Sequence, residues 1–125
     1  MSTDADVRAI DLGEVPVISL PGGSWSRMLV QERSVSGNRS SLGYSRFEPG
    51  TVLAPVRHTT EEVAYVVCGR GELRLDGKTV PFRAGQALFI PAGVWHSVAV
   101  TGEEPVEMVF GFPHPDYPPT ERRDS

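Results

Sequence analysis

Short apolar or alternating segments, four to seven residues long, recur along most of the chain. They have the length and the two-residue period of β-strands, and no segment sustains the apolar spacing of an amphipathic helix. The pattern predicts an all-β protein. The expected strands are Ser26–Gln31, Leu42–Phe47, Thr51–Val56, Val63–Cys68, Glu72–Leu75, Lys78–Phe82, Ala87–Ile90, Trp95–Val100 and Val106–Phe112.

Turn-forming residues separate these segments at short intervals, because the 13 glycines and 11 prolines are spread along the chain. Asp76-Gly77 between two strand-like segments is a hairpin signal, since both residues tolerate the positive φ of a two-residue turn. Many short strands with frequent turns are typical of an all-β sandwich or barrel. We therefore expect one barrel domain.

The two ends of the chain have a different pattern. Residues 1–12 are polar and predicted to be flexible, although Val7–Leu12 could add an edge strand. The barrel is expected over residues 13–112. Residues 113–125 contain four prolines and several charges, so we expect a tail without regular structure, in which His114 is solvated or caps the barrel mouth.

Composition narrows the class of protein. The chain has 125 residues, enough for one domain, and 12 Lys+Arg against 16 Asp+Glu give a net charge of −4. No basic stripe is present, so we expect no nucleic-acid partner. No apolar run approaches the ~18 residues of a membrane span, and the acidic N-terminus differs from a signal peptide. We predict a cytoplasmic protein, in which Cys68, the single cysteine, forms no intramolecular disulfide.

His58 and Glu62 could bind one metal ion if the chain turns between them. In a straight strand four residues span about 13 Å at ~3.3 Å per residue, whereas two ligands of one ion lie within a few ångströms of each other. The polar segment Thr59-Thr60-Glu61 could make that turn, so that Glu62 would begin the antiparallel neighbour of the strand that His58 ends. A second strand–turn–strand around Pro91-Ala92-Gly93 places His96 just after its turn.

The spacing around these residues resembles the two motifs of the cupin superfamily. The first motif runs Gly, five residues, His, one residue, His, three or four residues, Glu, six residues, Gly. The second runs Gly, five residues, Pro, one residue, Gly, two residues, His, three residues, Asn. At the positions of the first motif stand Gly50, Val56, His58, Glu62 and Gly69, and at those of the second Gly85, Pro91, Gly93, His96 and Val100.

The resemblance implies a single-domain cupin jelly-roll β-barrel with a divalent metal ion (Fe, Mn, Ni or Zn) inside it. Val56 stands where the family usually has its first metal-binding His, so the implied ligands are reduced to His58, Glu62 and His96. Such a 2-His-1-carboxylate set holds Fe(II) with open positions in other proteins. Val56 would leave one coordination position open in a drier pocket and weaken metal binding. Glu61 could replace Glu62 as the ligand.

Three functions remain open from the sequence. The first is a small metal-dependent enzyme acting on a small organic molecule by oxygenase, isomerase, lyase or cyclase chemistry, which is what the resemblance implies. The second is a non-catalytic cupin that binds a small ligand for sensing or storage. The third is a metal-free acid–base isomerase that uses His58 or His96 together with Tyr44 or Tyr65.

Several other side chains are candidates for the pocket wall. Strand alternation puts Tyr44 and Arg46 on one face, and the resemblance makes that face an inward one. An inward Arg46 would bind a substrate carboxylate or phosphate, and the alternative is a surface arginine. Tyr65 and Val56 are also candidates. Trp95 precedes His96 and should point to the opposite face, where it would be a core or dimer contact unless it reaches the ligand.

The resemblance also implies a homodimer. The apolar strand Val63–Val67 offers a surface for it. The expected partners are a second copy of the chain and a small-molecule substrate, with a carboxylate group if Arg46 faces inward.

Overall fold

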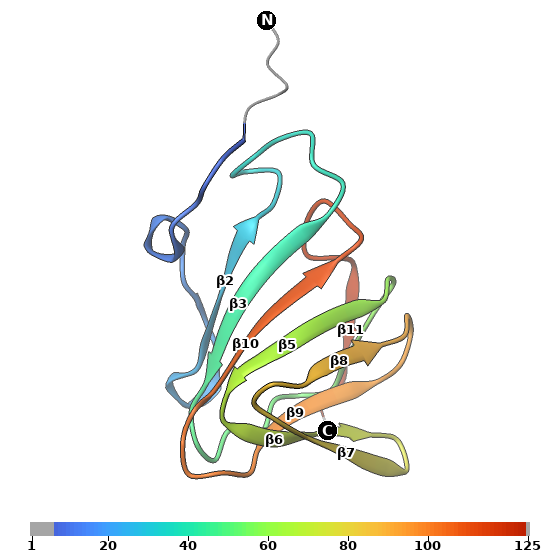
Figure 1. The fold of residues 1–125 in the computed structure, drawn as a ribbon. Coiled ribbons are helices and arrows are strands. Elements are labelled where there is room, and N and C mark those ends of the chain that lie inside the picture. Colours follow the sequence, from blue (N-terminus) through green and yellow to red (C-terminus); the bar gives the residue numbers. More distant parts are fainter. Residues whose placement is uncertain (1–6, 125) are drawn as a thin grey trace, which may run out of the picture.

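The computed structural model describes residues 7–124 and confirms an all-β fold (Figure 1). One antiparallel sheet has the strand order β1-β2-β3-β10-β5-β8, and the other has the order β11-β4-β9-β6-β7. The strands are β1 (Ile18–Ser19), β2 (Trp25–Val30), β3 (Ser41–Phe47), β4 (Val56–His58), β5 (Glu62–Cys68), β6 (Arg70–Leu75), β7 (Lys78–Arg83), β8 (Ala87–Ile90), β9 (His96–Val100), β10 (Val106–Phe112) and β11 (Thr120–Arg122).

The two sheets pack their inner faces together to form the core. Burial alternates along β3, where every second residue from Ser41 to Phe47 is buried, as expected for a strand with one face inward. Val66 and Val106 are completely buried at the centre. The core also includes Met28, Phe47, Leu73, Phe82, Leu88, Ile90, Met108, Phe110 and Phe112. Burial of these side chains is the main stabilising contribution to the barrel.

Eight of the nine predicted strands are present within about two residues of their expected ends. The prediction of a strand over Thr51–Val56 is wrong. Val52 forms only an isolated bridge with Ala99, and strand β4 begins at Val56, directly after Pro55. A proline has no N–H to donate to a ladder, so regular pairing resumes only beyond it.

Two motif glycines occupy turn positions with a positive φ, a backbone conformation that would be strained for other residues. Gly69 has φ 84°, and a Cβ there would lie 2.3 Å from the carbonyl oxygen of Pro105, so only glycine fits between β5 and β6. Gly93 has φ 79°, and its N–H donates to the carbonyl oxygen of His58 at 2.8 Å. That hydrogen bond ties the turn before His96 to the end of β4.

Both ends of the chain differ from the expectation. Val7–Leu12 forms no strand: a 3-10 turn covers Leu12–Glu14, and the edge strand is β1 instead. Residues 1–6 of the predicted flexible segment lie outside the described residues. Between residues 7 and 124 no helix is long and apolar enough to cross a membrane.

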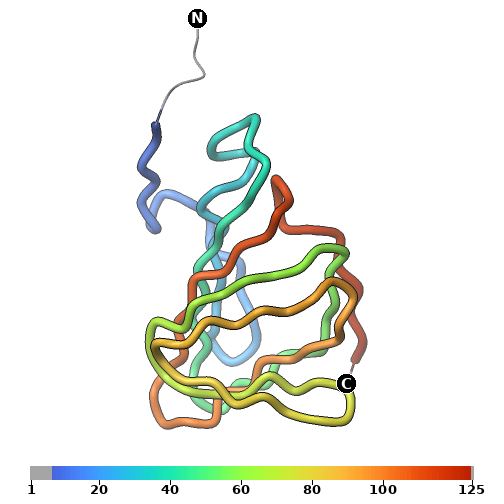
Figure 2. The backbone as a smooth tube through the Cα atoms, turned by 45° about the vertical axis from the view of Figure 1, so that its right-hand side comes forward, coloured from blue at the N-terminus to red at the C-terminus, as the bar shows by residue number. Residues whose placement is uncertain are grey.

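The prediction of an irregular C-terminal tail is also wrong. After the prolines the chain runs back along the barrel (red in Figure 2), and β11 pairs antiparallel with β4, Thr120 opposite His58 and Arg122 opposite Val56. This pairing is long-range and uses backbone hydrogen bonds, so three polar residues form a strand without any apolar alternation of their own.

Candidate metal centre

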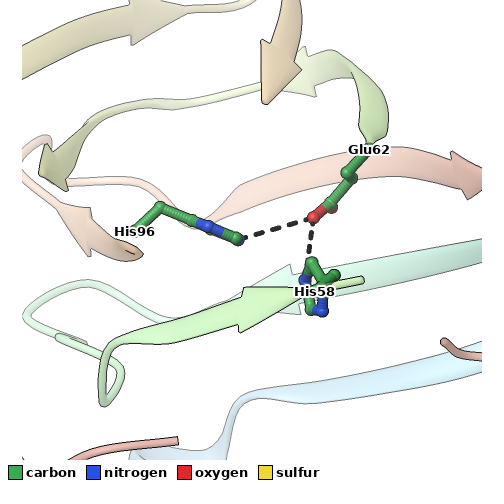
Figure 3. A group of neighbouring side chains, drawn as sticks. All are labelled: His58, Glu62 and His96. Carbon is green, nitrogen blue, oxygen red and sulfur yellow. Dashed lines mark ion pairs between the residues drawn. The ribbon is translucent and has the colours of Figure 1, made fainter. Parts of the chain in front are cut away.

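His58, Glu62 and His96 converge at one point inside the barrel (Figure 3). One carboxylate oxygen of Glu62 lies 3.2 Å from Nε2 of His58 and 3.5 Å from Nε2 of His96. One candidate ligand atom from each residue lies within 4.8 Å of the other two. Both imidazoles are buried, and the Glu62 side chain is 13% exposed. These are the three residues that the motif spacing selected, whereas Glu61 is exposed.

The backbone brings the three residues together across both sheets. His58 ends β4, the chain turns over Thr59–Glu61, and Glu62 begins β5. The turn is present as predicted, but the two strands are not antiparallel neighbours. Strand β4 lies between β9 and β11 in one sheet, while β5 lies between β8 and β10 in the other. The turn therefore passes from one sheet to the opposite one, which makes the two side chains face each other across the interior.

Hydrogen bonds fix both imidazole rings in the same tautomer. The Thr120 hydroxyl lies 2.7 Å from Nδ1 of His58 and donates its single hydrogen to the carbonyl oxygen two residues before it. It must therefore accept from Nδ1–H of His58. Nδ1 of His96 lies 2.9 Å from the carbonyl oxygen of Val94, which can only accept. Both rings thus direct Nε2 at the carboxylate, as metal-binding histidines with an anchored second nitrogen do.

The electrostatics of the cluster favour a cation among the three groups. Burial by itself would raise the pKa of Glu62, but hydrogen bonds from both histidines and their charges outweigh it, and the pKa of Glu62 is lowered. Burial by itself would lower the pKa of His96, but its hydrogen bonds to Glu62 and to the Val94 backbone, together with the charge of Glu62, outweigh that effect, and the pKa of His96 is raised. Both shifts favour a negative Glu62 carboxylate that shares the proton of a cationic imidazole. A metal ion could take the place of that proton.

The cluster forms part of the wall of a cavity of about 240 Å³. Val56 lines it on the same face of β4 as His58, two residues away. The rest of the wall is mostly apolar, with Phe47, Leu73, Leu88, Ile90, Met108 and Phe110. An apolar cavity with a few converging polar groups is the usual form of a site for a small organic molecule.

Residues 43–112, more than half of the chain, match the family described as "Cupin domain". This chain belongs to the cupin family. It is 36% identical over 104 residues to the polyketide synthase CurC of Streptomyces cyaneus, covering 82% of this chain and 67% of that protein. It is 35% identical over 112 residues to the dimethylsulfoniopropionate lyase DddW of Ruegeria pomeroyi, covering 83% and 70%.

The same fold occurs in the polyketide cyclase RemF of Streptomyces resistomycificus. The two structures superpose with a TM-score of 0.78 at 20% sequence identity, covering 94% of this chain and 85% of that one. The jelly-roll barrel predicted from the motif spacing is thereby confirmed for this cupin.

The C-terminal segment contributes three groups to the site that sequence reasoning missed. Thr120 anchors His58, Tyr117 packs the edge of its ring against His58 at 5.3 Å between centroids, and Arg122 lines the cavity beside Val56. Burial and the nearby charge of Glu62 raise the pKa of Tyr117 to about 12, so its phenol is protonated at neutral pH. No local sequence pattern marked these residues. They reach the site through the pairing of β11 with β4, in which Thr120 lies opposite His58, 62 residues earlier in the chain.

Tyr44 and Arg46 of β3 lie outside the cavity, so the predicted inward face is wrong. The inward residues of this strand are Ser45 and Phe47, which line the cavity. On the outer face the hydroxyl of Tyr44 donates to Glu107, and Arg46 pairs with Glu107 at 2.7 Å and also with a second glutamate. Burial and the hydrogen bond to Glu107 raise the pKa of Tyr44 to about 12. The alternation of side chains along β3 was predicted correctly, but the face predicted to point into the barrel points outward.

Tyr65 and Trp95 also lie away from the cluster. Tyr65 is on the outer face of β5 and 51% exposed, so it cannot assist either histidine. Trp95 stacks with the guanidinium groups of Arg57 and Arg123, 4.9 and 4.2 Å from its ring centroid. It lines a separate surface depression rather than the cavity. Trp95 thus covers the outside of the sheet that carries His96.

Proposed function

We propose that this cupin is a small metal-dependent enzyme that acts on a small organic molecule. His58, Glu62 and His96 hold one divalent ion, and the substrate lies in the adjoining cavity. The observation that carries the proposal is the convergence of three ligand atoms within 4.8 Å at the wall of an otherwise apolar cavity. The lyase among its relatives favours lyase chemistry, with cyclase, isomerase and oxygenase chemistry as further candidates.

The residues present fit a metal ion of the transition series. Two imidazole nitrogens and one carboxylate oxygen form a donor set that suits Fe, Mn, Ni or Zn. Neutral rings with Nδ1–H anchored present two Nε2 lone pairs to the same carboxylate, which is a repulsive arrangement unless a cation lies among them. When bound, the ion would supply a Lewis acid or an O₂-binding centre.

The chain itself supplies three further functions. Apolar walls exclude water from the reacting atoms and strengthen the electrostatic interactions there. The protonated phenol of Tyr117 lines the cavity and can donate a hydrogen bond to bound substrate. Thr120 and Val94 keep the two imidazoles oriented toward the ion.

Metal content tests the proposal directly. Protein purified without chelators, or supplied anaerobically with Fe(II), Mn(II), Ni(II) or Zn(II), is expected to hold close to one ion per chain by elemental analysis. A content near zero after such addition would contradict the metal centre. Turnover of carbonyl or carboxylate substrates by metal-free protein would indicate an acid–base isomerase using His58 or His96. Stoichiometric metal without any turnover would indicate a binding protein.

We further propose that this cupin pairs with a second copy through the outer face of β5 and β8. Val63, Tyr65 and Val67 alternate along that face of β5 with 50%, 51% and 45% exposure, and Phe89, opposite Val63, is 62% exposed. Contiguous apolar surface of this kind marks protein contacts. The cytoplasmic location stays a prediction from the sequence.

Sedimentation velocity checks this pairing. The wild type is expected to be a dimer and Phe89→Asp a monomer, because the charge would be buried without a partner. Val80→Asp is the matched control, since Val80 is an exposed apolar residue on β7, outside that face. A monomeric wild type, or two variants that behave alike, would contradict the assigned interface.

A further inference from the structure

Strand β11 places an arginine at the edge of the cavity. Residues two apart in a strand share a face, and Thr120 contacts His58 in the interior. Arg122 therefore lies on the inward face of β11, opposite Val56 of β4. It lines the cavity and also the surface depression next to it. Its guanidinium thus lies at the boundary between the cavity and solvent.

Arg122 is not neutralised by the rest of the described chain. Two neighbouring arginines have carboxylate partners, Arg57 with Glu121 and Arg123 with Asp76. Arg122 forms no ion pair with any carboxylate of residues 7–124, and no other arginine or lysine of that range lines the cavity. Among residues 7–124, Arg122 is therefore the one arginine or lysine available to an anion in the cavity.

The position of Arg122 relative to the metal centre is set by strand register. On the inner face Val56 pairs with Arg122 on one side and with His96 on the other. Adjacent strands lie ~4.8 Å apart, so the backbones of Arg122 and His96 are roughly 10 Å apart. An arginine side chain that extends across Val56 toward His96 spans much of that distance. The space above the small Val56 side chain is therefore bounded by a guanidinium and by the candidate metal centre.

We propose that Arg122 binds a carboxylate of the substrate in the space beside Val56, while the apolar part of the substrate fills the cavity. A guanidinium holds a carboxylate through two parallel hydrogen bonds. The inference rests on the proposed function for the role of the ion, but anion binding by Arg122 needs no metal. It replaces Arg46, which lies on the outer face, as the residue that recognises an anionic substrate.

The test compares benzoate with benzamide, which has nearly the same shape but no charge. Binding is measured by NMR titration on the full chain, once after metal removal and once after loading with Zn(II). Arg122→Gln is expected to weaken benzoate binding about tenfold in both forms and to change benzamide binding less than about twofold. Arg122→Lys should recover part of the benzoate affinity, because it restores the charge without the paired geometry.

Arg57→Gln is the matched control, since it removes the same charge from an adjacent strand outside the cavity. It should leave both affinities unchanged. The proposal is overturned if Arg122→Gln weakens both probes equally, if Arg57→Gln has the same effect as Arg122→Gln, or if the wild type does not bind benzoate. A failure of the metal centre would appear separately, as a zinc content near zero by elemental analysis of the Zn(II)-loaded protein.

Discussion

Replacing His96 by alanine is expected to remove the metal ion from this cupin. Within residues 7–124 only three candidate ligands converge in the site, and Nε2 of His96 is one of them. Zinc sites of four ligands bind with ~10–16 kcal/mol, about 3 kcal/mol for each ligand, so losing one of three should weaken binding at least about hundredfold. Elemental analysis after gel filtration should fall from about one ion per chain to background.

A matched control separates loss of a ligand from loss of any histidine. His114 lies in the C-terminal segment, where its ring bonds the backbone at Asp116, and it takes no part in the cluster. His114→Ala should therefore keep full metal content. Because His96 is buried, His96→Gln is a second variant that retains side-chain volume. If either His96 variant binds metal as tightly as the wild type, His96 is not a ligand.

Replacing Val56 by histidine is expected to have the opposite effect. Val56 lies on the inward face of β4, two residues before His58 and opposite His96, so a histidine there would point toward the same ion. A fourth ligand should tighten metal binding by about hundredfold. Competition with a chromogenic chelator measures the change in Kd.

Val80→His provides the control for a histidine added elsewhere, because Val80 is an exposed residue of β7 that does not line the cavity. It should leave the metal Kd unchanged. Val56→His should also fill the space beside Arg122 and so weaken benzoate binding. An unchanged metal affinity in Val56→His would show that position 56 does not face the ion.

The sequence determined the barrel and most of its strands because the signals for them are local. Two-residue apolar alternation and frequent turns predict short strands wherever they occur. The motif glycines carry information because of backbone geometry: at Gly69 a side chain would collide with a carbonyl oxygen. The spacing of these turns from His58, Glu62 and His96 resembles the two cupin motifs, and that resemblance selected all three members of the cluster.

The local sequence pattern was a weaker guide to which face of a strand points into the barrel. Tyr44 and Arg46 alternate with Ser45 and Phe47, and a polar residue can satisfy either face of a strand. The structure directs the polar pair outward, where Glu107 of the neighbouring strand partners both side chains. That choice depends on a residue more than sixty positions away, so the alternation of β3 alone could not settle it.

The sequence by itself thus determined the fold, the turn between His58 and Glu62, and the identity of the three converging residues. Only the tertiary structure decided that β4 and β5 belong to opposite sheets and that the C-terminal segment returns as β11. That return brings Thr120, Tyr117 and Arg122 to the site. The reason is physical. Strands pair through backbone groups that every residue except proline carries in full, so the local pattern of a segment does not reveal which distant strand it pairs with.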